Sequence, residues 1–200
     1  MKTDVSFWNY TRLSAFRGRP RDAVAEWEKL GINVGFSFRY DPNEDSRDEM
    51  IALIEECERR NMKLIVYDAR IYSPPEGFDE REYAARASEA AEDFGKFPAV
   101  AGFYLGDEPT KAQFGRYRKA LKILSDVTDR QGFMNFSWCD AHLKDFSGRA
   151  EYADYLTAFA RETGLKLISN DRYSALPARD YEPGVRAPGP AKYFAALNLF

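Results

Sequence analysis

The sequence is short of the residues on which several classes of protein depend. Its 200 residues include one histidine, His142, and two cysteines, Cys57 and Cys139. One histidine cannot supply a metal site that needs two or more imidazole ligands, and one possible cysteine pair defines no disulfide framework. No apolar run is long enough to cross a membrane. We therefore exclude histidine-rich metal centres and disulfide scaffolds, and expect no membrane partner.

An excess of charge of one sign is also missing. The 29 basic and 32 acidic side chains give a net charge of −3, and the two signs are mixed along the chain. This balance gives no reason to expect nucleic acid as a partner. The first four residues lead directly into an apolar segment, so we expect no signal peptide. A cytoplasmic protein and a processed, exported one remain open, as does the oligomeric state.

What the sequence does have is a regular alternation of predicted strands and helices. Apolar runs and alternating patterns predict strands over residues 5–10, 33–39, 63–68, 100–108, 132–138 and 165–170. Between them, apolar residues at helical spacing predict helices over residues 22–30, 46–60, 79–94, 110–127 and 152–163. Such alternation is typical of a parallel sheet with helical crossovers.

Two α/β architectures fit this alternation, and the strand ends favour one of them. A doubly wound sheet that binds nucleotides has a glycine-rich turn after its first strand, and Asn9-Tyr10-Thr11-Arg12 contains no glycine. Polar or aromatic residues follow every predicted strand, as in a TIM (β/α)8 barrel. About six strand–helix units are visible, whereas a complete barrel takes about 250 residues. We therefore predict one domain over residues 1–200 that forms the first three quarters of a barrel.

The predicted strand before Pro109 ends in two carboxylates, Asp107 and Glu108. Strand side chains alternate between two faces, so Ala101, Phe103 and Leu105 are expected to pack under helices. The opposite face, expected to line the barrel, carries Gly102, Tyr104, Gly106 and Glu108. A glutamate at this position would point inward, and burial would raise its pKa as a general acid requires.

The stretch Gly102-Phe103-Tyr104-Leu105-Gly106-Asp107-Glu108-Pro109 resembles the fourth-strand motif of the (β/α)8-barrel glycoside hydrolases. It looks most like the β-galactosidase-like and uncharacterised bacterial branches of that clan. Residues 133–136 are similar to the fifth strand of the family, and residues 169–173 to the end of its sixth. The resemblance implies hydrolysis of an O-glycosidic bond, as in polysaccharide degradation, with Glu108 as the general acid/base.

The sequence departs from the family pattern in two ways. Asp107 stands where the commoner motif has an asparagine that contacts the sugar 2-hydroxyl. The resemblance also implies a nucleophilic carboxylate at the end of a seventh strand, and none can be identified here. We therefore expect little or no turnover from this chain alone.

Eight further residues are candidates for carbohydrate binding: Asp107, Trp8, Arg39, Asp68, Asn135, Trp138, Asp171 and Tyr173. Most have a structural alternative. The tryptophans could be core lids, Arg39 and Asp68 a salt bridge, and Asn135 part of a buried network. Asp107 could cap the helix that begins near Thr110, and Glu108 could pair with Arg70.

The sequence thus predicts a glycoside hydrolase-like domain that acts on a carbohydrate and uses no cofactor or metal. A non-catalytic carbohydrate-binding or scaffold protein on the same barrel is the alternative. A third class, a metal-dependent hydrolase, is disfavoured by the lone histidine, although four acidic residues could form an all-oxygen site: Asp68, Asp107, Glu108 and Asp171.

Overall fold

The computed structural model describes residues 4–16, 19–136 and 146–170. The chain divides into two compact units. Unit 1 comprises Met1–Gly106 and Gly115–Phe133, and unit 2 comprises Asp107–Phe114 and Met134–Phe200. In the described residues, no helix is both long and apolar enough to cross a membrane.

Strands and helices alternate along the chain as the sequence predicts. The strands are β1 (Val34–Tyr40), β2 (Lys63–Asp68), β3 (Val100–Asp107), β4 (Gln131–Phe136) and β5 (Ser169–Asn170), and they follow one another in that order in the sheet. The β1–β2, β2–β3 and β4–β5 pairs are parallel. The helices are α1 (Pro20–Lys29), α2 (Arg47–Arg59), α3 (Glu80–Ala90), α4 (Phe114–Val127) and α5 (Arg149–Thr163). Shorter helical turns are η1 (Leu13–Phe16), η2 (Ala91–Gly95) and η3 (Lys111–Gln113).

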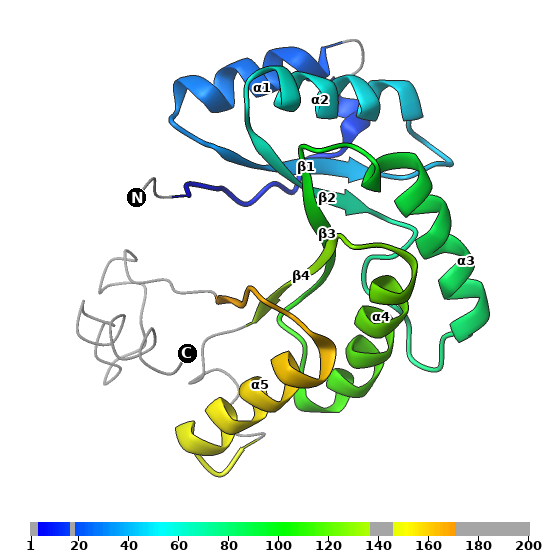
Figure 1. The fold of residues 1–200 in the computed structure, drawn as a ribbon, viewed down its shortest axis with the longest axis vertical. Coiled ribbons are helices and arrows are strands. Elements are labelled where there is room, and N and C mark those ends of the chain that lie inside the picture. Colours follow the sequence, from blue (N-terminus) through cyan, green and yellow to red (C-terminus); the bar gives the residue numbers. More distant parts are fainter. Residues whose placement is uncertain (1–3, 17–18, 137–145, 171–200) are drawn as a thin grey trace. The chain divides into compact units, whose positions relative to one another are not determined.

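In unit 1, helices α1 to α4 lie on one side of strands β1 to β3 (Figure 1). Helix α2 illustrates why. The Ser46 side chain caps its first turn by accepting a hydrogen bond from the Glu49 amide. Apolar residues at helical spacing then give the helix one buried face, which includes Met50, Leu53, Ile54 and Cys57.

The other face of these strands carries a group of rings that we call the aromatic cluster. Its members are Trp8, Phe36, Tyr67, Tyr72, Tyr104 and Phe133, packed with Ile65. Tyr104 of β3 is 2% exposed, and its ring centroid lies 4.9 Å from those of both Phe36 and Tyr72. The prediction that Tyr104 lies on the face opposite the helices is therefore right.

The alternation predicted for β3 does not hold at every position. Ala101 is exposed, although it was expected to pack under helices. A Cβ atom on Gly106 would lie 2.4 Å from Cε1 of Tyr117, so this glycine lies against α4 and not on the face that carries Tyr104. The tyrosine ring occupies the space of a side chain, which is why glycine is needed there.

The first and last predicted strands also differ from the structure. Residues 5–10 form no strand but run beside β1, where the Asn33 and Val34 amides both donate to the Val5 carbonyl. Farther along, the Asn9 side chain donates to the Phe36 carbonyl. Of predicted strand 165–170, only Ser169–Asn170 is a strand.

Unit 2 has its own aromatic core. The rings of Phe114, Phe136 and Phe159 lie 5.5 to 6.0 Å apart, and all three side chains are buried. Helix α5 ends at Thr163 and is followed by Gly164, whose φ of 69° is the left-handed conformation expected of a glycine after a helix.

Candidate active site

Strand β3 ends in an unusual backbone conformation at Glu108. The φ angle of Glu108 is 40°, in the left-handed region that residues with a side chain rarely adopt. Such a conformation costs about 1–3 kcal/mol and persists only where the surroundings enforce it. Here the Glu108 amide donates a hydrogen bond to the Asn135 carbonyl at 2.9 Å. The next residue, Pro109, is buried and cannot continue the ladder.

A chain of side-chain hydrogen bonds links the ends of β3, β4 and β5. Asn135 Nδ2 donates to Asp107 Oδ1 at 2.9 Å, and Asn135 Oδ1 accepts a hydrogen bond from Ser169 Oγ at 2.7 Å. Asn135 and Ser169 are register partners in the parallel β4–β5 pair, so their side chains leave the sheet on the same face. Asn135 is 1% exposed, and its amide therefore needs these partners.

Asp107 does not cap the following helix, contrary to one of the two roles considered for it. The Thr110 amide instead donates to Gln113 Oε1 at 3.0 Å, in the reciprocal arrangement of a capping box. The Asp107 carboxylate is half-buried and accepts the bond from Asn135. Its position next to Glu108 is fixed through this bond.

The Glu108 side chain is exposed, whereas the sequence predicted burial. The prediction extended the alternation of β3 by one residue beyond its end, and the left-handed backbone at Glu108 interrupts that alternation. An exposed carboxyl is open to solvent and to a ligand.

Asp68 and Arg39 do not form the salt bridge that was considered for them. Asp68 is fully buried and accepts hydrogen bonds from Arg70, at 2.7 Å from Nη2, while Arg70 also binds Asp93 at 2.8 Å. Burial raises the pKa of the Asp68 carboxyl, and the hydrogen bonds from Arg70 oppose that rise. Arg39 pairs with Asp41 at 3.1 Å. The alternative partner considered for Glu108, Arg70, is thus engaged by aspartates.

Trp8 belongs to the aromatic cluster. Its ring centroid lies 5.0 Å from that of Phe36 and 5.2 Å from that of Tyr104, and its side chain is half-buried. These contacts favour the core role considered for this tryptophan, and sugar stacking by Trp8 stays a prediction. Trp138, Asp171 and Tyr173 lie outside the described residues, so their predicted binding roles also stay predictions.

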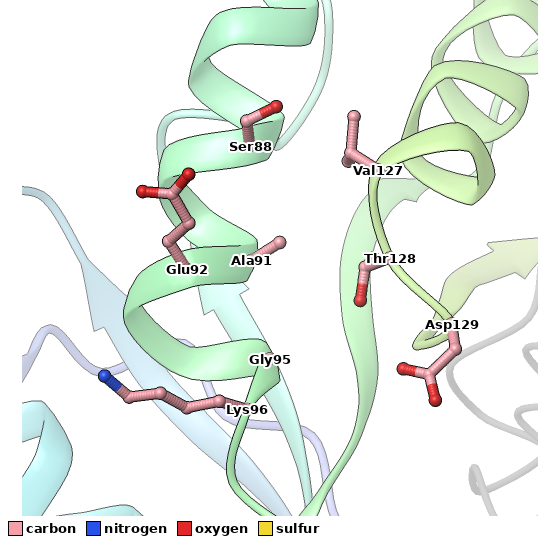
Figure 2. A pocket seen from close by; sticks show the side chains of 8 residues that line it. All are labelled: Ser88, Ala91, Glu92, Gly95, Lys96, Val127, Thr128 and Asp129. Atoms are coloured by element: carbon pink, nitrogen blue, oxygen red, sulfur yellow. The ribbon is translucent and has the colours of Figure 1, made fainter.

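A cavity of about 500 Å³ opens elsewhere on unit 1 (Figure 2). Its lining comes from α3, η2 and the end of α4: Ser88, Ala91, Glu92, Gly95, Lys96, Val127, Thr128 and Asp129. Gly95 and Lys96 precede β3, and Thr128 and Asp129 precede β4, so the cavity lies where these strands begin. Active sites of (β/α)8 barrels form at the opposite ends of their strands, where Glu108 and Asn135 lie. Within the described ranges, no group of three acidic, cysteine or histidine side chains could hold a metal ion.

Ser169 is the member of this site that was not among the predicted site residues. Its role depends on the register between β4 and β5, which a single sequence does not reveal. The motif over residues 169–173 contains Ser169, but the sequence pattern pointed only to Asp171 and Tyr173 within it.

No family model matches the sequence, and no curated protein sequence matches it. The fold, however, is similar to several solved structures. One is a GH10 xylanase of Thermobacillus composti, 13% identical, with a TM-score of 0.59 over 91% of this chain and 60% of the other. Another is a β-galactosidase from the psychrophilic Marinomonas ef1, 13% identical, with a TM-score of 0.56 over 92% and 42%.

A third is the GH113 β-mannanase AaManA of Alicyclobacillus acidocaldarius, 13% identical, with a TM-score of 0.53 over 84% of this chain and 69% of the other. The chain spans 42% of the length of the β-galactosidase and 60% of that of the xylanase. At such identities the likeness establishes the fold. The chain has the (β/α)8-barrel fold of glycoside hydrolases, in part, and the resemblance predicted from the sequence is confirmed at that level.

Proposed function

We propose that the protein is a glycoside hydrolase in which Glu108 is the general acid/base. The observation that carries the proposal is the exposed Glu108, held in a left-handed conformation directly after β3. Strained residues with a side chain cluster at active sites, because function and not local stability keeps them there. The position also matches the end of a barrel strand, where catalytic residues of this fold lie.

The proposed chemistry begins with a proton transfer. As the bond between the anomeric carbon and the leaving oxygen breaks, the Glu108 carboxylic acid gives its proton to that oxygen. The resulting carboxylate then takes a proton from the water that completes hydrolysis in a retaining enzyme. A second carboxylate is required as nucleophile, or as the base in an inverting enzyme, and the resemblance implies a place for it at the end of a seventh strand.

Carbohydrates with β-linked sugars are the proposed substrates. The structures of similar fold include enzymes named xylanase, β-mannanase and β-galactosidase, which supports this class. Asp107 replaces the asparagine of the commoner motif, so we expect it to contact the sugar through its carboxylate. Contacts from Trp138, Asp171 and Tyr173 are part of the same proposal.

Turnover of β-linked oligosaccharides tests the proposal. Because little turnover is expected from residues 1–200 alone, xylo-, manno- and galacto-oligosaccharides are incubated with the full-length protein and with its Glu108→Gln variant, and reducing ends are measured. The variant keeps the shape of the side chain but cannot transfer the proton, so we expect a loss of about 10²- to 10⁴-fold. Glu76→Gln, which changes an exposed loop glutamate, is the matched control and should retain wild-type turnover.

Two results would contradict the proposal. Full activity in Glu108→Gln would remove this glutamate from the mechanism. Oligosaccharide binding by calorimetry, without turnover of any substrate and unchanged in Glu108→Gln, would instead support the carbohydrate-binding alternative.

A further inference from the structure

The geometry points to Asn135 and Ser169 as positioning residues that hold the Asp107-Glu108 dipeptide in its reactive arrangement. This inference rests on the proposed role of Glu108. Asn135 forms two hydrogen bonds with the dipeptide. Its backbone carbonyl accepts one from the Glu108 amide, and its side chain donates one to the Asp107 carboxylate. One buried residue thus fixes both the strained backbone of Glu108 and the acid beside it.

Ser169 satisfies the end of the Asn135 amide that faces away from Asp107. A carboxylate only accepts hydrogen bonds, so Asn135 must turn its NH₂ group toward Asp107. The carbonyl oxygen of the same amide then faces β5 and requires a donor. The Ser169 hydroxyl supplies it at 2.7 Å, because the register places Ser169 directly beside Asn135. The hydrogen bonds therefore run in one direction, from Ser169 through Asn135 to Asp107.

The loss of the Ser169 hydroxyl would leave the Asn135 oxygen unsatisfied in a site that is 1% exposed. An unpaired buried polar atom is costly, so the amide would rotate or shift to recover a partner. Either movement would disturb the bond to Asp107 and loosen the turn that presents Glu108. A small displacement of a catalytic group can lower the rate by up to about 10²-fold.

The test compares Ser169→Val with Ser169→Thr. Both side chains are branched and of nearly equal volume, and only threonine keeps the hydroxyl. In the full-length protein, we measure kcat and KM for two aryl β-glycosides, one with a poor leaving group that needs protonation and one with an acidic phenol that does not. Ser169→Val should lower kcat for the poor leaving group roughly 10- to 100-fold, with little change in KM and a much smaller loss for the acidic phenol. Ser169→Thr should restore most of the rate.

A second comparison separates positioning from a merely structural role. In the Glu108→Gln background, Ser169→Val should lower the residual rate no further, because its effect passes through Glu108. Thr157→Ala is the control, since it removes an exposed hydroxyl from α5 that only bonds the Ala153 carbonyl. Thr157→Ala should leave the ratio of the kcat values for the two substrates unchanged.

The outcomes separate this inference from the proposed function. If Glu108→Gln itself retains activity on the poor leaving group, the proposed function fails. The positioning role is overturned if Glu108→Gln is impaired but Ser169→Val lowers kcat equally for both substrates. It is also overturned if Ser169→Val and Ser169→Thr have the same kcat. The role is overturned as well if Ser169→Val lowers the rate in the Glu108→Gln background by the same factor as in the wild type.

Discussion

At the scale of single residues, the conformation of Glu108 is the feature that most separates this site from ordinary barrel structure. Glu108 is exposed, and its φ of 40° lies in the region that glycine adopts more readily than glutamate. A glycine at this position would adopt the same backbone without a steric penalty. The proposed acid/base role gives one reason for a carboxyl group at this position.

This explanation predicts a conflict between stability and activity at residue 108. Glu108→Gly and Glu108→Ala both remove the carboxyl, and both should lose turnover of oligosaccharides. Only glycine relieves the positive φ, so Glu108→Gly should be about 1 kcal/mol more stable to unfolding than Glu108→Ala. Urea denaturation of the two variants measures the difference. If Glu108→Ala is as stable as Glu108→Gly, the backbone at this position is not strained.

At the scale of elements, helix α2 carries an acid-sensitive group. Glu56 is 7% exposed, and hydrogen bonds from Arg59 and then Arg60 lower its pKa to about 2, although burial opposes the shift. Arg60 also bonds Glu28 of α1, so Glu56 belongs to a connection between two helices. The ionised carboxylate therefore stabilises the folded state.

The sign of the pH dependence follows from the lowered pKa. The stabilisation by Glu56 is fully present above its unfolded pKa of 4.5, and it is lost as the pH falls from there toward about 2. Glu56→Gln should thus be less stable than wild type at pH 7, and the difference should shrink at pH 3. Urea unfolding at both pH values checks this, with the exposed Glu55→Gln as control. A difference that is the same at both pH values would contradict the assignment.

The contact between β3 and α4 makes a second prediction at this scale. A Cβ on Gly106 would lie 2.4 Å from the Tyr117 ring, whereas a Cβ on Gly115, in α4, would have nothing within 4 Å. Gly106→Ala should therefore destabilise the protein by about 1–3 kcal/mol. Gly115→Ala should stabilise it by up to about 1 kcal/mol, because alanine favours helix. Thermal unfolding of both variants measures these changes in stability. Equal changes would show that the Tyr117 ring moves aside for the added Cβ at little cost.

At the scale of the whole molecule, the alternation of strands and helices could be read from the sequence because apolar spacing determines it. Strand β2 has the predicted bounds, residues 63–68. The site was only partly predictable. Asp107, Glu108 and Asn135 stand out as polar residues at apolar strand ends, but the bond from Ser169 to Asn135 depends on a register between strands that are far apart in sequence. The left-handed backbone of Glu108 likewise depends on contacts made after folding.

In the whole molecule, the proposed function requires that Glu108 protonates the leaving group in a barrel of the glycoside hydrolase kind. The most direct measurement is kcat/KM for a series of aryl β-glycosides graded by the acidity of the phenol, with wild type and Glu108→Ala compared. If Glu108 is the acid, the variant should lose most on the least acidic phenols, by about 10²- to 10⁴-fold, and almost nothing on the most acidic. A loss of the same size across the whole series, or no loss at all, would contradict the account.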